Sequence, residues 1–130
     1  NRHALQRVDA VLLTHDHSDH VNGLDELRTV FFHNGRKLID LYSNEETIRA
    51  IEERWPYVFK ARFNVYAEFM KAHIVPGYGA FRVGDIDIIS FEQDHKVCTS
   101  LGFRFGDVAY STDVVRLNEK SLDALRGVET

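Results

Sequence analysis

Residues 8–20 of the chain read VDAVLLTHDHSDH, an apolar run followed at once by a cluster of histidines and aspartates. A continuous apolar run of this kind is typical of a strand that is buried on both faces of its sheet. Three histidines and two aspartates then fall within positions 15–20. Because ligands of α/β proteins bind beyond the carboxyl ends of strands, this stretch predicts half of a site for two metal ions.

The spacing within the motif predicts how its side chains point. His15 and His17 are two residues apart, so in an extended backbone they point the same way. Asp19 and His20 follow on a turn, where they can face a second ion. Imidazole nitrogen suits zinc, iron, nickel and copper, whereas carboxylate oxygen suits manganese and magnesium. The mixed donor set therefore fits several divalent metals.

These residues give the chain a resemblance to metallo-β-lactamase-fold hydrolases, whose signature T-H-x-H-x-D-H follows a buried strand. FEQDH at 91–95 follows the apolar strand at 86–90, and its His95 resembles the family's next metal histidine. AYSTD at 109–113 resembles the segment whose aspartate, here Asp113, bridges the two metals. Among subgroups, the pattern is most similar to the branch that contains phosphoribosyl 1,2-cyclic phosphate phosphodiesterase, with the tRNA 3′-end processing nucleases nearby.

The resemblance implies a ligand for each ion at matching positions of this sequence. His15, His17 and His95 would bind the first ion. Asp19 and His20 would bind the second ion.

The same resemblance implies that Asp113 bridges the two ions, and that Asp19 and Asp113 take part in catalysis. The implied cofactors are two divalent cations, zinc or manganese, with iron as a further candidate. Neighbouring residues have simpler expected roles. Thr14 and Ser111 are expected to form hydrogen bonds, and Asp16 is expected to point away from the metals.

The implied fold class is α/β, as part of a metallo-β-lactamase-type αβ/βα sandwich with a mixed sheet. Such folds carry a pair of strands before the first motif and a late histidine on the second metal. Here the motif begins close to Asn1, and no histidine follows His95. We therefore expect residues 1–130 to be a single domain that is an internal fragment of a longer metallo-β-lactamase-fold domain.

Composition narrows the expected partners. A formal net charge of −4 argues against a broad nucleic-acid-binding face, so a small phosphoester substrate is expected rather than nucleic acid. The single Cys98 excludes an internal disulfide and favours a reducing compartment, the cytoplasm. No apolar run approaches the ~20 residues needed to span a bilayer, so no membrane partner is expected.

Local patterns predict three helices after the motif. Apolar residues at helical spacing predict a helix over 23–33, ended by Asn34 and Gly35. Ser43 with Glu46 predicts a capping box for a second helix, which ends before Pro56. A third helix is predicted after residue 118, capped by an asparagine, with leucines 122 and 125 facing inward.

The expected strands are 8–13, 37–42, 81–83, 86–91, 101–105 and 108–111, with Gly-Asp turns at 84–85 and 106–107. Residues 57–80 are predicted as an irregular insertion. Its His73 is expected to be packed or hydrogen-bonded. Its aromatic residues are expected either to form a small core of their own or to cover a nucleobase: Phe59, Phe63, Tyr66 and Phe69.

Motif and resemblance together predict a di-metal hydrolase that cleaves a small cyclic or nucleotide-like phosphodiester with a hydroxide held between the ions. One alternative is another hydrolase of the same scaffold, such as a tRNA-processing nuclease or a lactone or thioester hydrolase. A second alternative is a non-catalytic metal-binding domain. Because the late histidine is outside the chain, the fragment alone is expected to be inactive.

Overall fold

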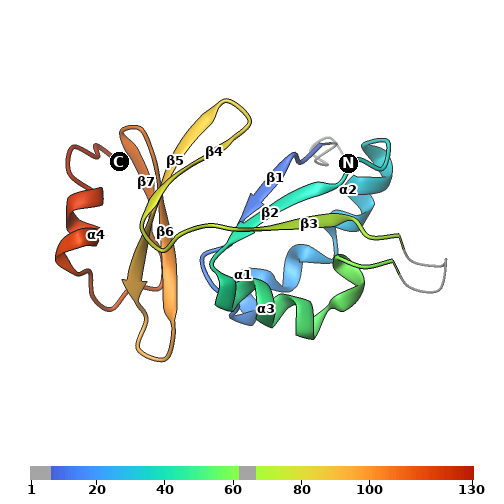
Figure 1. Cartoon of the computed structure of the whole chain (residues 1–130), viewed down its shortest axis with the longest axis horizontal. Helices are drawn as coiled ribbons and strands as arrows, with labels where there is room; N and C mark the ends of the chain where they lie inside the picture. Colours follow the sequence, from blue (N-terminus) through green and yellow to red (C-terminus); the bar gives the residue numbers. More distant parts are fainter. Residues whose placement is uncertain (1–6, 62–66) are drawn as a thin grey trace. The chain divides into compact units, whose positions relative to one another are not determined.

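A computed structural model describes residues 7–61 and 67–130 of the chain. The chain divides into two compact units, residues 1–73 and residues 74–130 (Figure 1). The expectation of a single domain within a longer one stays a prediction.

Unit 1 is built on a three-stranded sheet in the order β1-β2-β3. Its strands are β1 (Ala10–Leu12), β2 (Ile39–Ser43) and β3 (Met70–Ile74) (Figure 1). β1 and β2 are parallel, with Leu12 opposite Tyr42. Side chains along β2 alternate between buried and partly exposed positions, as the two-residue period of a strand requires.

Helices supply the core that covers this sheet. They are α1 (Ser18–Val21), the 3₁₀ turn η1 (Asn22–Leu24), α2 (Leu27–His33), α3 (Glu45–Arg54) and the 3₁₀ turn η2 (Pro56–Val58). Apolar residues from the strands and these helices form one buried cluster, which includes Leu13, Val21, Phe31, Leu41, Ile51 and Phe69. The apolar strand before the motif and the motif's own first helical turn are thus fixed to the same core.

The predicted helix over 23–33 is interrupted in the structure. η1 covers residues 22–24, and α2 begins only at Leu27. Gly23 explains part of this difference, because glycine is unfavourable inside a helix. The predicted end is confirmed: Asn34 is the C-cap, and Gly35 has a φ of 63°.

The predicted capping box at Ser43 is wrong by one position. Asn44 is the N-cap of α3, and its side chain accepts a hydrogen bond of 2.9 Å from the backbone nitrogen of Thr47. Ser43 is instead the buried last residue of β2, where its Oγ donates to the carbonyl oxygen of Leu13 at 2.8 Å. Because Ser43 bonds to the residue that follows β1, β2 continues through Ser43, and Asn44 becomes the N-cap of α3.

The prediction that residues 57–80 form an irregular insertion is also wrong in part. β3 occupies 70–74, and the backbone nitrogen of Ile39 donates to the carbonyl oxygen of Phe69 at 3.0 Å. Phe69 is fully buried in the core of unit 1, and Phe59 packs against that core. These two aromatic residues therefore belong to the core, whereas Phe63 and Tyr66 lie outside the described residues.

Unit 2 is an antiparallel sheet in the order β4-β5-β6-β7 with one helix (Figure 1). Its elements are β4 (Gly79–Val83), β5 (Ile86–Asp94), β6 (Thr99–Phe105), β7 (Val108–Tyr110) and α4 (Glu119–Ala124). Gly84 and Gly106 have φ values of 60° and 64°, as tight turns between antiparallel strands favour. Parallel pairing in unit 1 and antiparallel pairing in unit 2 agree with the predicted mixture.

α4 is attached to its sheet by hydrogen bonds more than by apolar packing. Asn118 caps the helix as predicted, because its side chain accepts from the backbone nitrogen of Ser121. Ser121 Oγ donates to the carbonyl oxygen of Glu92 in β5 at 2.6 Å. The prediction that Leu122 faces inward is wrong, since 53% of its surface is exposed, and Leu125 is half-buried.

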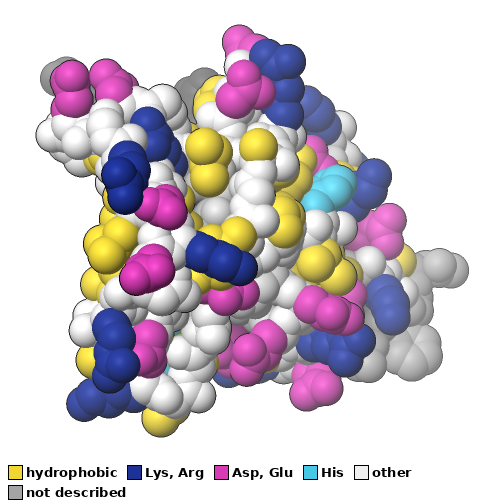
Figure 2. Space-filling model, turned by 60° about the vertical axis from the view of Figure 1, so that its left-hand side comes forward, with side chains coloured by type: hydrophobic (Ala, Val, Ile, Leu, Met, Phe, Trp, Pro, Cys, Tyr) yellow, Lys and Arg dark blue, Asp and Glu magenta, His cyan; other side chains and the backbone are white. Residues whose placement is uncertain are grey.

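Charges of both signs are distributed over the molecular face that Figure 2 shows, where lysine and arginine side chains stand beside aspartate and glutamate. This pattern agrees with the slightly acidic composition of the chain. Among the helices of the described residues, none has the length and apolar character needed to cross a bilayer.

Candidate metal centre

The histidine motif of unit 1 begins where pairing between β1 and β2 ends. The backbone nitrogen of Leu13 donates to the carbonyl oxygen of Tyr42 at 2.9 Å. Ser43 Oγ donates back to the carbonyl oxygen of Leu13 at 2.8 Å. These two bonds fix the last residues before the motif against β2, so the chain leaves the sheet at a defined point.

Three imidazole rings converge at this point. The ring centroids of His15 and His17 are 4.5 Å apart, and those of His15 and His20 are 4.3 Å apart. The predicted turn is the first turn of α1: His17 is its N-cap in extended conformation, and the backbone nitrogen of His20 donates to the carbonyl oxygen of His17. Extended backbone followed by one helical turn thus brings the third histidine beside the first.

His15 is buried, with 1% of its surface exposed. Thr14 Oγ1 lies 2.9 Å from His15 Nδ1, which is the kind of hydrogen bond predicted for Thr14. A hydrogen bond at one ring nitrogen fixes the orientation of an imidazole and leaves its other nitrogen to face a ligand. Asp19 differs strongly from His15, because 80% of its side chain is exposed and its Oδ2 lies 3.5 Å from His20 Nε2.

Arg54 of α3 holds the residue between the first two histidines. Its Nη1 donates to the carbonyl oxygen of Asp16 at 3.0 Å, and its Nη2 lies 3.3 Å from Asp16 Oδ2. The carboxylate of Asp16 therefore engages a cation of its own unit. Arg54 could not be identified from the sequence, because no local pattern relates a residue of α3 to a loop that far away in the chain.

The second pair of predicted ligands lies in unit 2. His95 follows β5 directly, and Asp113 lies just beyond the end of β7. The β5-β6-β7 meander brings these two strand ends together, and His95 Nε2 lies 3.7 Å from Asp113 Oδ2. The backbone of Asp94 pairs with that of Arg116, which keeps the segment after Asp113 against the end of β5.

The separations between donor atoms are compatible with a shared cation. Direct hydrogen bonds between nitrogen and oxygen span about 2.7–3.2 Å. Two ligand atoms that each lie about 2.1 Å from one ion are roughly 3–4 Å apart. His95 Nε2 to Asp113 Oδ2 at 3.7 Å, and His20 Nε2 to Asp19 Oδ2 at 3.5 Å, both fall in the second range. The nitrogen and oxygen donors present therefore fit divalent metals.

The structure thus brings the predicted ligands together in two sets. One set lies in unit 1 and contains His15, His17 and His20, with Asp19 at its exposed side. The other set lies in unit 2 and contains His95 and Asp113. That the two sets share one site stays a prediction.

Sequence reasoning missed a second residue, Gln93, which is buried to 1% exposure in β5. Its amide hydrogen-bonds to Ser100, to Ser111 and to the backbone of Thr112. The bond with Ser111 is the kind of role predicted for that serine. The available signal was a long polar side chain at an inward position of an apolar strand.

His73 is packed and hydrogen-bonded, as predicted. Its Nε2 lies 2.6 Å from Asp40 Oδ1, and its ring stacks on that of Tyr42 with centroids 4.6 Å apart. Burial, and then the charge of Asp40, raise the pKa of the Tyr42 hydroxyl. The contacts with Asp40 and Tyr42 account for the position of His73.

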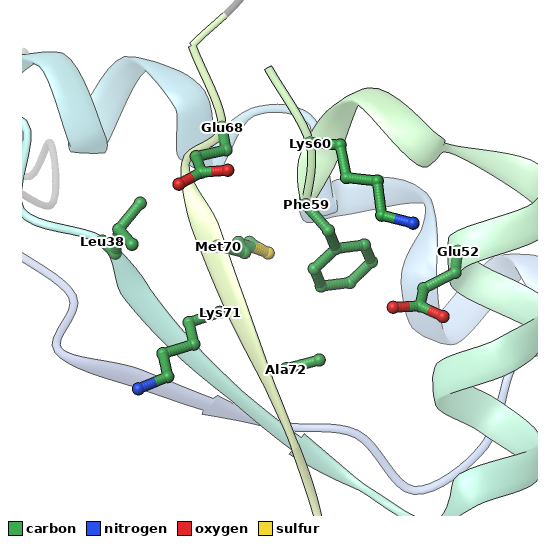
Figure 3. Close-up of a pocket in the computed structure, with 8 residues that line it drawn as sticks. All are labelled: Leu38, Glu52, Phe59, Lys60, Glu68, Met70, Lys71 and Ala72. Atoms are coloured by element: carbon green, nitrogen blue, oxygen red, sulfur yellow. The ribbon is translucent and has the colours of Figure 1, made fainter.

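Unit 1 also has an open pocket of about 400 Å³, shown in Figure 3. Its apolar lining consists of Leu38, Phe59, Met70 and Ala72, and two lysines and two glutamates stand around it. The formal charges of these four residues sum to zero. None of the six predicted ligands lines it.

The chain is similar in sequence to a known protein family. The model of the beta-lactamase superfamily domain matches residues 1–130. A solved structure described as a new diphosphatase from the PhnP family is 30% identical in sequence, with a TM-score of 0.83 over 98% of this chain.

Two curated relatives are similar to the chain. An octanoyltransferase of Porphyromonas gingivalis is 30% identical over 94% of this chain. The exodeoxyribonuclease WalJ of Streptococcus pneumoniae is 32% identical over 75% of this chain. The chain spans 24% and 32% of the lengths of these relatives and 47% of the diphosphatase structure.

Proposed function

Because this chain belongs to the beta-lactamase superfamily, we propose that it is part of a metal-dependent hydrolase that cleaves phosphodiesters. The match over the whole chain, together with the likeness to the diphosphatase structure, confirms the predicted metallo-β-lactamase fold with parallel and antiparallel pairings. The substrate class and the roles of individual residues are the content of the proposal.

In this proposal, His15, His17 and His95 would hold one divalent ion, and Asp19 and His20 would hold a second. Asp113 would be shared by the two ions. The single observation that carries the proposal is the donor spacing in unit 2, where His95 Nε2 and Asp113 Oδ2 lie 3.7 Å apart.

Two bound divalent ions supply the means to deprotonate water near neutral pH and to draw charge from a phosphoryl oxygen. The residues of this chain hold and orient the donors. Thr14 orients the ring of His15 through Nδ1. The turn of α1 places the ring of His20 beside that of His15. Asp19 stands at the exposed side of the set, where a substrate can approach.

A phosphodiester suits such a centre for an electrostatic reason. A diester carries one negative charge, and further charge develops on its oxygens during in-line displacement, where two cations stabilise it. A phosphomonoester carries more charge and resembles the product, so nucleotide monophosphates are expected to inhibit. The similarity to a diphosphatase and to an exodeoxyribonuclease supports phosphoester or phosphoanhydride chemistry in general.

The test uses the full-length protein that contains this chain. Metal analysis after gentle purification should find close to two equivalents of manganese, zinc or iron per chain. One panel should then compare kcat/KM for a phosphodiester such as bis(p-nitrophenyl) phosphate, a phosphomonoester, a lactone and a β-lactam. The diester should lead. A tenfold lead of the lactone or β-lactam, about 1.4 kcal/mol of transition-state preference, would replace the proposal.

A nuclease is the second candidate, favoured by the 32% identity to an exodeoxyribonuclease. Against it stands the net charge of −4, since binding to a nucleic-acid backbone normally uses clustered lysine and arginine. Adding a single-stranded oligonucleotide to the panel separates the two candidates. If its kcat/KM exceeds that of small diesters and falls steeply with salt, the nuclease is preferred.

A cytoplasmic location belongs to the same proposal. It is supported by the single cysteine of the chain, which is usual in a reducing compartment. Fractionation of cells that express the full-length protein tests it.

A further inference from the structure

Gln93 is buried in β5 and lies two residues before His95. Its Nε2 donates to Ser100 Oγ at 3.1 Å and to the carbonyl oxygen of Thr112 at 2.9 Å. Its Oε1 accepts a hydrogen bond of 2.5 Å from Ser111 Oγ. Both amide hydrogens and the amide oxygen are therefore used, as a buried amide requires.

Two of these three bonds end on the segment that leaves β7. The strand ends at Tyr110, so residues 111–113 continue beyond its paired positions. Ser100 Oγ lies 3.5 Å from the carbonyl oxygen of Asp113. Asp113 has a φ of 51°, in the left-handed region that a residue other than glycine keeps only when its surroundings fix it. The bonds from Gln93 are part of those surroundings.

Thr112 connects this backbone segment to the carboxylate of Asp113. Thr112 Oγ1 lies 3.2 Å from Asp113 Oδ1, and the carbonyl oxygen of Thr112 is the atom that Gln93 binds. The other carboxylate oxygen, Oδ2, lies 3.7 Å from His95 Nε2. On the far side, the backbone pairing of Asp94 with Arg116 holds the chain after the aspartate. Asp113 is thus held from both sides.

The neighbouring strand leaves room for the amide. A Cβ on Gly102 of β6 would lie 2.8 Å from Gln93 Oε1 and 2.2 Å from Cζ of Phe91. Any side chain at residue 102 would therefore displace the amide or the aromatic ring. Space and hydrogen bonds together give the side chain of Gln93 one defined position.

We propose that Gln93 is a positioning residue, which holds the backbone of residues 111–113 so that the Asp113 carboxylate stays beside His95. The inference rests on the proposed function, because it concerns the geometry of two residues that are proposed there as metal ligands. Groups that orient metal ligands typically change metal affinity or activity by about 10- to 100-fold when removed. Gln93 acts through the backbone, and we expect an effect in that range.

The test compares two variants of the full-length protein. Gln93→Met keeps the length of the side chain and removes all three hydrogen bonds of the amide, two donated and one accepted. Ser121→Ala is the matched control, because it removes a buried hydrogen bond to β5, at Glu92, without touching residues 111–113. The measurements are Zn²⁺ affinity of the metal-free protein by titration calorimetry, melting temperature, and kcat and KM for bis(p-nitrophenyl) phosphate.

Both variants should lower the melting temperature to a similar degree. Only Gln93→Met should weaken Zn²⁺ binding and lower kcat, each by about 10- to 100-fold, with KM changed little. Unchanged Zn²⁺ affinity and kcat in folded Gln93→Met overturns the proposal, as does an equal loss in Ser121→Ala. If Gln93→Met does not fold, Ser111→Ala replaces it, since it removes one bond only. It should show a smaller loss of Zn²⁺ affinity, and no loss overturns the proposal.

The wild-type protein tests the proposed function independently of the Gln93 variants. If the wild-type protein binds Zn²⁺ but cleaves no phosphodiester, the proposed function fails, and the Zn²⁺ affinities of the variants still decide the role of Gln93. If the wild-type protein binds no divalent metal, both the proposed function and the role of Gln93 are overturned.

Discussion

The two sets of predicted ligands are held in different ways. In unit 1, three histidines within six positions are placed by local backbone, namely an extended segment followed by one turn of α1. In unit 2, His95 and Asp113 come from the ends of two strands that are not adjacent in the sheet. Their position depends on the meander and on a buried amide. Local placement resists the loss of a single neighbour, whereas long-range placement depends on particular side chains.

The largest effect is expected from removing a ligand in either set. In the full-length protein, His17→Ala and Asp113→Ala should each lower kcat/KM about a thousandfold or more, since a lost ligand removes roughly 4 kcal/mol of charge stabilisation. His33→Ala is the control, because that exposed histidine caps α2 through the carbonyl oxygen of Thr29. Circular dichroism must show that all three variants fold. A wild-type rate for Asp113→Ala would remove this residue from the centre.

The next largest effect is expected on the free energy of unfolding, where glycine substitutions should act differently in the two units. Gly102→Ala places a Cβ against the ring of Phe91 and the amide of Gln93, so it should lower the free energy of unfolding by about 1–3 kcal/mol. Gly23→Ala in η1 meets nothing within 4 Å, and it should stabilise by less than about 1 kcal/mol. Urea unfolding measures both. Equal effects would mean that the unit 2 sheet relaxes around the added methyl group.

Helix caps should give a smaller effect, again larger in unit 2. Asn44→Ala should lower the free energy of unfolding by about 1 kcal/mol, the usual loss for an N-cap. Asn118→Ala should lower it further, because Asn118 Nδ2 also donates to the hydroxyl of Tyr78 at 2.6 Å. The same urea titration tests the order. If Asn44→Ala has the larger effect, the hydrogen-bonded attachment of α4 is less important than described.

The smallest effect is expected from Arg54, the unit 1 counterpart of Gln93. Its contacts with Asp16 are partly exposed, and such ion pairs contribute at most about 1 kcal/mol. Arg54→Ala should therefore lower kcat less than about fivefold, far less than Gln93→Met. Arg49→Ala, on the same helix with its own ion pair to Glu45, serves as the control. A loss for Arg54→Ala as large as that for Gln93→Met would contradict the contrast between the units.

The sequence predicted most of what is local. The helix end at Gly35, the Gly-Asp turns and the Asn118 cap follow from short patterns, and the structure confirms them. A strand before His15 is also present, but it covers only Ala10–Leu12 rather than 8–13. Its residues are half-buried at the end of the sheet order instead of buried on both faces. The structure also brings the three histidines of the motif together as expected, because strand and turn determine where consecutive side chains point. That they bind metal stays a prediction.

What the sequence could not predict depends on distant residues. β3 was missed because its alternation is weak and its place is determined by pairing within the sheet. The pattern at Ser43 predicts a cap wrongly, because its true partner, the carbonyl oxygen of Leu13, follows another strand. Arg54 and Gln93 contact loops far away in the sequence. Tertiary contacts of this kind leave no periodic pattern in the chain.

The most direct test of the central claim, that both ligand sets hold one pair of ions, is anomalous diffraction from crystals of the full-length protein grown with Zn²⁺ or Mn²⁺. We expect two anomalous peaks about 3.5–4 Å apart. His15, His17 and His95 should surround one of them, and Asp113 should contact both. Peaks that contact residues of unit 1 alone or unit 2 alone, or no peak at either set, would contradict the claim.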